Sequence, residues 1–202
     1  MTGRFVVLEG GDGSGKSTQL RGLVAWLREQ GIEVVETFEP GATDAGAAIR
    51  ELLLHRPDPI DAVAEALLMA ADRAQHVATV IRPALARGAW VVSDRFLPSS
   101  LVYQGVVRGL GVGAVAAINR LAVGEVAPDL VVLLDVSDVV AEARRASETD
   151  KLEAEGAAFH AQVRAAYRDL ASPNGWVTVD ANAPLDVVAG AVRDAVVPLL
   201  AG

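Results

Sequence analysis

The sequence has no cysteine, and this absence excludes several kinds of chemistry. Without thiols the chain forms no disulfides, no thiolate metal site and no cysteine nucleophile. Positive charge is also scarce, because 18 Lys and Arg stand against 26 Asp and Glu and leave a formal net charge of −8. Proteins that bind the nucleic-acid backbone need a basic surface. We therefore expect no nucleic-acid partner.

Long uninterrupted apolar runs are missing too. The first apolar run, residues 5–8, is short and leads straight into a glycine-rich turn, which is unlike a secretory signal. Residues 187–200 are apolar but contain Arg193, Asp194 and Pro198, and this pattern favours a packed helix over a membrane span. We therefore expect a cytoplasmic protein with no membrane partner.

Short apolar runs alternate with longer helical patterns along a chain without repeats or linkers. Because 51% of the 202 residues are apolar, the chain can bury the core of one α/β domain, residues 1–202. The alternation predicts a three-layer α/β/α fold, a parallel five-stranded sheet between helices with sites at the carboxyl ends of its strands. We expect strands at 5–8, 33–37, 90–92, 130–134 and 176–179, and helices at about 16–30, 45–54, 60–87, 112–124, 137–146, 153–171 and 184–200.

The glycine-rich turn after the first run is the most informative part of the chain. Gly10, four intervening residues and then Gly15-Lys16-Ser17 match the phosphate-binding loop (P-loop) pattern between a strand and a helix. Glycines let backbone N–H groups curl around an anion, and the helix N-terminus adds its positive end. Lys16 can reach the β- and γ-phosphates, and the Ser17 hydroxyl can ligate Mg²⁺. The chain is therefore predicted to bind a nucleoside triphosphate.

Three charged residues near this loop carry further chemistry. Asp94 and Arg95 follow the third expected strand, where Asp94 can meet Mg²⁺ and Arg95 can clamp a phosphate, or where both form a solvated ion pair. Asp12 lies inside the P-loop, although a carboxylate beside polyphosphate is electrostatically unfavourable. We interpret Asp12 as a partner for a sugar hydroxyl or for Mg²⁺-bound water, with a simple turn former as the alternative.

The helix expected at 60–87 places Met69, Asp72, Arg73 and His76 on one face. Arg73 is a candidate for hydrogen bonding to a base or a phosphate, whereas Asp72 and His76 are more typical of structural residues. Residues 99–105 combine hydroxyls, an aromatic ring and an amide, which suit recognition of a nucleoside; the alternative is a loop that enters a helix.

Glu39 and Pro40 follow the second expected strand, at the carboxyl edge of the sheet. The simplest alternative for this stretch is a Pro-Gly turn before a helix cap. The stretch around Glu39 and Pro40 and the stretches described above together resemble the motifs of bacterial-type thymidylate kinases. These are P-loop enzymes that phosphorylate dTMP to dTDP. The resemblance covers nearly the whole chain, with matching runs at 9–18, 39–43, 49–54, 71–76, 94–96, 99–100, 103–105 and 134–136.

The resemblance implies that ATP and Mg²⁺ bind at the P-loop, with Lys16 on the transferring phosphate. Metal contacts are expected at Ser17 and Asp94. The segment at about 144–152 is similar to the family's lid, and because Gly13 replaces the arginine of the eukaryotic-type loop, the catalytic cation is expected from this lid. The candidate ATP-binding residues are Gly10, Gly11, Asp12, Gly13, Ser14, Gly15, Lys16, Ser17 and Thr18, and the candidate catalytic residues are Lys16, Arg95, Arg144 and Arg145.

The resemblance also implies a dTMP site. There Asp12 accepts a hydrogen bond from the 3′-hydroxyl, Arg50 and Arg95 hold the 5′-phosphate, and other residues surround the base and sugar. Arg73 is expected to bond to thymine O4, and Tyr103 to press against C2′ of the sugar. The family is usually homodimeric. The candidate acceptor-binding residues are Asp12, Glu39, Pro40, Arg50, Met69, Arg73, Arg95, Ser100, Tyr103 and Gln104.

Other functions remain as alternatives. Met69 stands where the family has a phenylalanine against the thymine ring, so a nucleotide kinase with altered base preference is one of them. A degenerate ATP-binding paralogue is another. A GTPase-like switch is disfavoured because the sequence has no Asn-Lys-x-Asp run for reading guanine.

Overall fold

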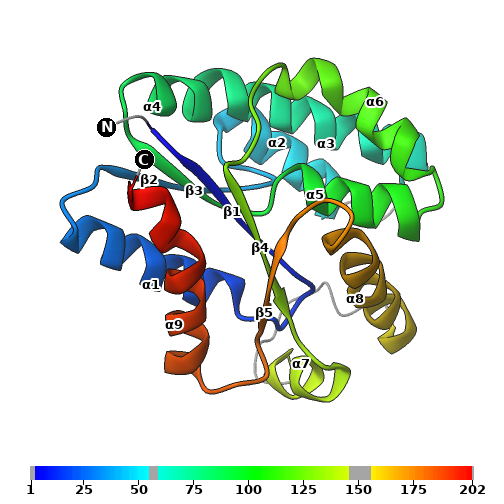
Figure 1. Ribbon diagram of the computed structural model, residues 1–202. Coiled ribbons are helices and arrows are strands. Elements are labelled where there is room, and N and C mark those ends of the chain that lie inside the picture. Colours follow the sequence, from blue (N-terminus) through cyan, green and yellow to red (C-terminus); the bar gives the residue numbers. More distant parts are fainter. Residues whose placement is uncertain (1–2, 55–58, 146–155, 202) are drawn as a thin grey trace.

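The computed structural model describes residues 3–54, 59–145 and 156–201. Five parallel strands form one sheet in the order β2-β3-β1-β4-β5, with helices on both faces (Figure 1). This confirms the expected three-layer α/β/α fold. The strands are β1 (Phe5–Glu9), β2 (Val34–Phe38), β3 (Trp90–Asp94), β4 (Leu130–Asp135) and β5 (Val177–Asp180).

The helices lie close to their expected positions, with two exceptions described below. Figure 1 shows α1 and α9 on one side of the sheet and α3, α4 and α6 on the other. The helices are α1 (Lys16–Glu29), α2 (Asp44–Leu54), α3 (Ala62–His76), α4 (Arg82–Ala86), α5 (Leu97–Ser100), α6 (Val112–Val123), α7 (Asp138–Arg145), α8 (Ala157–Ala171) and α9 (Leu185–Val196).

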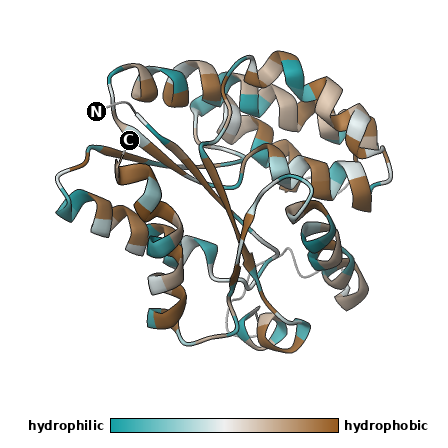
Figure 2. Ribbon diagram, in the orientation of Figure 1, coloured by the Kyte–Doolittle hydropathy of each residue, from teal (hydrophilic) through white to brown (hydrophobic). Residues whose placement is uncertain are grey.

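The central strand β1 explains why its apolar run is continuous. Val6 and Leu8 belong to the core beneath α1 and α9, whereas Phe5 and Val7 belong to the core on the opposite face. Successive side chains of a strand point to opposite faces, so a sheet covered on both faces needs apolar residues at every position. Figure 2 shows the resulting band of hydrophobic residues along the strands.

The single helix expected at 60–87 is interrupted. The chain forms α3, then a π-helical segment at Val77–Ile81, and then α4, which contains Pro83. Proline has no N–H group and its ring crowds the carbonyl four residues earlier, so the regular hydrogen-bond ladder cannot continue through this point. The wider π-helical turn lets the chain keep one overall direction.

The helical stretch at residues 97–107 was not predicted. Residues 99–105 were interpreted as a segment that recognises a nucleoside, with a loop that enters a helix as the alternative. The structure has α5 followed by a π-helical segment at Leu101–Val107. Pro98 suits the first turn of a helix, but adjacent serines usually favour caps and turns. That local preference is overridden because Pro98, Ser99 and Ser100 are buried against the rest of the fold.

Helix α7 packs directly against the P-loop. A Cβ atom on Gly13 would lie 2.6 Å from the carbonyl oxygen of Ala141 in α7, and Gly13 has a left-handed φ of 78°. The expected lid at about 144–152 begins at the end of this helix, and its residues 146–152 lie outside the described residues. In the described parts of the chain, no helix has the length and apolarity needed to cross a bilayer.

The Gly13→Ala substitution should therefore lower the free energy of unfolding by more than the strain of the backbone angle alone would. The control is Gly31→Ala, because Gly31 has a φ of 80° but nothing within 4 Å of an added Cβ. We expect Gly31→Ala to lower the free energy of unfolding by about 1 kcal/mol, and Gly13→Ala to lower it further and to weaken ATP binding. Chemical denaturation and ATP titration measure both effects. Equal losses of stability for the two variants, with ATP binding intact, would contradict the close packing of α7.

Candidate active site

The P-loop leaves β1 at Glu9 and enters α1 at Lys16, which is buried. The Lys16 ammonium donates hydrogen bonds to the carbonyl oxygens of Gly10 at 2.9 Å and Gly11 at 3.1 Å. Burial lowers the pKa of Lys16, and the positive charge of Arg95 lowers it further. An anion bound in the loop would offer this ammonium a charged partner in place of two neutral carbonyls.

Ser17, in the first turn of α1, lies beside Asp94 at the end of β3. The Ser17 hydroxyl donates to Asp94 Oδ2 at 2.9 Å, and Asp94 Oδ1 is buried without a hydrogen-bond partner. An unpartnered carboxylate oxygen beside a hydroxyl fits the oxygen ligands that Mg²⁺ prefers. Within the described ranges there is no group of three or more His, Asp or Glu residues able to hold a metal. The nucleotide's phosphates would have to complete such a site.

Arg95 connects the P-loop to the expected acceptor site. Its guanidinium donates to Asp12 Oδ1 at 2.7 Å and to the Tyr167 hydroxyl at 3.1 Å, and it lies 5.4 Å from the centre of the Tyr103 ring. The backbone of Arg95 has a φ of 72°, a conformation that non-glycine residues rarely adopt. Neighbouring structure must hold this conformation, and the next residues explain how.

Glu9, at the end of β1, is fully buried and accepts four hydrogen bonds. They come from the backbone N–H groups of Phe96 and Ser99 at 2.9 and 3.2 Å, the Ser99 hydroxyl at 2.7 Å and the Tyr167 hydroxyl at 2.8 Å. Burial raises the pKa of Glu9, although Arg95 and these donors act in the opposite direction. Glu9 thus holds the residues that follow Arg95 and connects β1 to α8, while the backbone N–H of Arg95 itself donates to the Leu8 carbonyl of β1 at 3.0 Å.

Arg73 is the centre of a second buried cluster, and its side chain has no exposed surface. Nε donates to Glu39 at 2.9 Å, and Nη2 donates to the Phe96 carbonyl at 3.1 Å and lies 2.8 Å from Glu39. Nη1 donates to the Ser100 hydroxyl at 3.1 Å and to the side-chain oxygen of Asn119. All five N–H donors of this guanidinium therefore have protein partners.

The turn after β2 lies beside this cluster. Arg50 of α2 donates to the Pro40 carbonyl at 2.8 Å, which brings Arg50, Glu39 and Pro40 together. Gln104 donates to Glu65 at 2.7 Å, while its own side-chain oxygen is buried without a partner. Met69 is partly buried on α3, one turn from Arg73.

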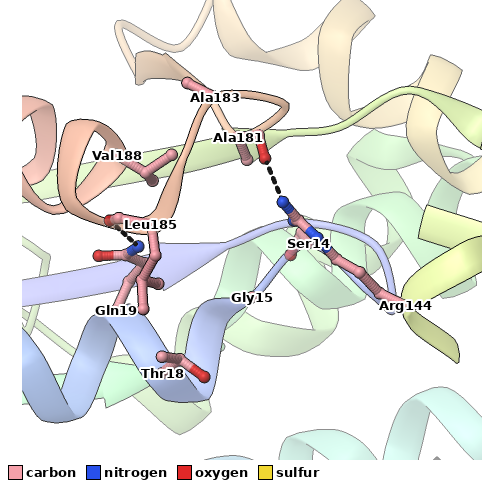
Figure 3. Close-up of a pocket in the computed structure, with 9 residues that line it drawn as sticks. All are labelled: Ser14, Gly15, Thr18, Gln19, Arg144, Ala181, Ala183, Leu185 and Val188. Carbon is pink, nitrogen blue, oxygen red and sulfur yellow. Dashed lines mark hydrogen bonds between the residues drawn. The ribbon is translucent and has the colours of Figure 1, made fainter. Parts of the chain in front are cut away.

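Arg144 lies at a different edge of the P-loop. It donates to the carbonyl oxygens of Ala181 at 2.9 Å and Gly13 at 3.4 Å. Figure 3 shows Arg144 beside a cavity of about 180 Å³ that lies between the start of α1 and the loop from β5 to α9. The side chain of Arg145 lies outside the described residues. The cavity is lined by Ser14, Gly15, Thr18, Gln19, Arg144, Ala181, Ala183, Leu185 and Val188.

Several residues of these clusters were missed as site residues from the sequence. Glu9 carried the signal that identified Asp94, a carboxylate at the carboxyl end of an apolar strand. Asn119 and Tyr167 lie far along the chain in amphipathic helices, where no spacing marks them; the scarcity of tyrosine was the only hint for Tyr167. Their roles depend on which helices the fold places over the sheet edge.

The two tyrosines of the chain allow an optical test of this arrangement. Burial raises the pKa of Tyr103 to about 12, and burial together with the negative charge of Glu9 raises the pKa of Tyr167 well above its usual range. A raised pKa keeps a phenol protonated to higher pH. We therefore expect little phenolate absorbance in the folded protein near pH 10, where unfolded tyrosine titrates.

Alkaline titration of the native protein, of the unfolded protein and of Tyr103→Phe measures this shift, with circular dichroism to confirm folding. Half-maximal phenolate absorbance near pH 10 in the folded protein would contradict the buried arrangement of both hydroxyls.

Comparison with known proteins identifies the family of this site. Residues 8–192 match the family model described as Thymidylate kinase. A thymidylate kinase of Leifsonia xyli subsp. xyli is 52% identical over 195 residues, covering 95% of this chain and 93% of that protein. One from Clavibacter sepedonicus is 52% identical over 198 residues, covering 96% and 94%, and one from Synechococcus sp. (strain CC9311) is 46% identical over 201 residues, covering 96% and 95%. The chain belongs to the thymidylate kinase family.

Proposed function

We propose that this chain transfers the γ-phosphoryl group of ATP to dTMP, forming dTDP and ADP, at the carboxyl edge of its sheet. Family membership supports the reaction and the use of ATP. The observation that carries the proposed geometry is the position of Arg95. It bonds to Asp12 in the P-loop and lies against Tyr103, so one cation adjoins both the donor loop and a second site.

For the donor half, we assign ATP to Gly10–Thr18, with Lys16 on the transferring phosphate. Ser17 and Asp94 would hold Mg²⁺, which when bound neutralises phosphate charge. The cavity beside Arg144 continues from the P-loop toward α9 and is large enough for part of the nucleoside. Arg144 and Arg145, at the end of α7, are the proposed lid cations.

For the acceptor half, Arg50 and Arg95 would hold the 5′-phosphate of dTMP, while Asp12 would accept from the 3′-hydroxyl. Tyr103 would contact the sugar. The base would be surrounded by residues of α3 and of the π-helical segment that follows α5. The proposed base-site residues are Met69, Arg73, Ser100 and Gln104, beside the turn of Glu39 and Pro40.

All N–H groups of Arg73 already have partners in the protein, and this adds a condition to the proposal. A base carbonyl can bond to Arg73 only by replacing one of its present partners. Among them the Ser100 hydroxyl is the one that rotation about a single bond can remove, because Glu39 is an ion-pair partner and the Phe96 carbonyl belongs to the backbone. The remaining partner, the Asn119 amide, is held in place by its own hydrogen bond to the Val115 carbonyl. Binding of the base would therefore replace the hydrogen bond between Arg73 and Ser100 with one between Arg73 and the base carbonyl.

The chemistry requires positioning more than proton transfer. The acceptor is already a phosphate anion, so no general base is needed. Lys16, Arg95 and a lid arginine would supply positive charge around the reacting phosphates and stabilise the charge that develops during in-line transfer. Exclusion of water by a closed lid would prevent hydrolysis of ATP.

The first test is release of ADP with ATP, Mg²⁺ and a series of acceptors: dTMP, dUMP, UMP, dCMP, dGMP and AMP. We expect turnover that depends on dTMP, with dUMP weaker and UMP negligible because Tyr103 disfavours a 2′-hydroxyl. Lys16→Ala, checked for folding by circular dichroism, is the control and should be inactive. A different preferred acceptor would favour a kinase with altered base preference, and ATP turnover without any acceptor would contradict the proposal.

We also propose that residues 1–202 act as one domain, cytoplasmic and homodimeric. Val63 and Leu67 of α3 are 48% and 53% exposed, and Leu121 of α6 is 94% exposed. Because α3 and α6 pack side by side, these residues give the molecule an apolar surface suited to a second copy of the chain. Sedimentation equilibrium should give twice the monomer mass, and Leu121→Asp should shift it toward the monomer. A parent protein that sediments as a monomer at micromolar concentration would contradict the dimer.

A further inference from the structure

A row of four buried side chains leads from β2 to the acceptor site. The Thr37 hydroxyl lies 2.6 Å from Nε2 of His76, and Nδ1 of His76 lies 2.9 Å from Glu39 Oε1. The other oxygen of Glu39, Oε2, accepts from Nε of Arg73 at 2.9 Å. None of the four is more than 6% exposed. The polar atoms of the row therefore depend on protein partners rather than on water for their hydrogen bonds.

The partners determine the direction of each bond. A carboxylate paired with a guanidinium accepts hydrogen bonds and donates none, so the proton of His76 must be on Nδ1. In the neutral imidazole Nε2 then carries the lone pair and accepts from the Thr37 hydroxyl. Nδ1 of His76 is therefore the donor in the contact with Glu39, and this contact orients the ring.

His76 determines how the Glu39 carboxylate is turned. With Oε1 bonded to His76, Oε2 faces Arg73 and lies within reach of both Nε and Nη2. The adjoining turn is held by α3 as well, because the backbone N–H of Gly41 donates to Asp72 Oδ1 at 3.0 Å. Without His76, Oε1 would be a buried acceptor without a partner, and the carboxylate would be free to rotate away from Arg73.

We propose that His76, oriented by Thr37, is a positioning residue that acts through Glu39 to hold Arg73 in place for the acceptor's base. This inference rests on the proposed function, in which Arg73 reads the base of dTMP. The catalytic groups at the P-loop are not part of the row. The consequence is specific: loss of His76 should raise KM for the acceptor and leave KM for ATP nearly unchanged.

Two amide substitutions separate the two contacts of His76. The side-chain nitrogen of Asn occupies roughly the place of Nδ1 and can still donate to Glu39, whereas that of Gln occupies roughly the place of Nε2 and reaches toward Thr37. We expect H76Q to raise KM for dTMP about tenfold, as for loss of one hydrogen bond to a charged group. H76N should stay within about threefold of the parent enzyme, and KM for ATP should change less than about twofold in both.

The ratio of kcat/KM for dTMP to that for dCMP gives a second readout. Thymine presents an acceptor at position 4 where cytosine presents an amino donor, so a well-placed Arg73 favours thymine. H76Q should lower this ratio and H76N should largely keep it. A role in core packing alone would lower the melting temperature of both variants without changing the ratio.

Arg73→Ala in the same assays separates the inference from the proposed function. If Arg73→Ala leaves KM for dTMP and the ratio unchanged, both the base-reading role of Arg73 and the inference are wrong. If Arg73→Ala changes them and H76Q does not, only the inference is wrong. Where H76Q is not recovered folded, His76→Phe carries the test, because it keeps an aromatic ring but has no donor for Glu39. A rise in KM for dTMP with KM for ATP unchanged supports the inference, and no rise overturns it.

Discussion

The burial of Glu9 at the end of the central strand is the interaction on which the site depends. A carboxylate with no exposed surface is costly unless its oxygens are bonded, and Glu9 accepts from two backbone N–H groups and two hydroxyls. These donors come from the segment after β3 and from α8, so the carboxylate joins three parts of the fold. Arg95 keeps its left-handed backbone because its own N–H is bonded to Leu8 of β1 and the next residue, Phe96, is bonded to Glu9.

A second buried carboxylate lies two strands further along the sheet edge, beyond β3. Glu39 follows β2 as Glu9 ends β1, and it pairs with Arg73 and His76. Glu39 thus anchors Arg73 directly, on the side proposed for the base, and Glu9 anchors Arg95 through the residues that follow it, on the side proposed for the phosphates. Because each buried charge has bonded partners, the polar site can lie on top of an apolar core without large loss of stability.

The sequence predicted the local parts of this arrangement well. The P-loop follows from its glycine spacing between a strand and a helix, because those signals lie within a few residues of each other. Ser17 and Asp94 were each expected beside Mg²⁺, and the hydrogen bond that joins them across 77 positions is a feature of the tertiary structure. The interruption of the helix after His76 and the helical stretch around Ser100 were not predicted. The effect of a proline on a helix, and the choice of a serine between a helix and a turn, depend on the tertiary surroundings of those residues.

What the sequence determined by itself was the alternation of strands and helices, and with it a parallel sheet whose carboxyl ends carry the phosphate loop. Apolar periodicity encodes burial, and burial on both faces leaves few other architectures. Only the tertiary structure decided that Asn119 would complete the bonds of Arg73 and that Tyr167 would reach both Glu9 and Arg95. Those contacts join residues 46 to 158 positions apart, and pairing over such distances depends on how helices pack rather than on any local pattern.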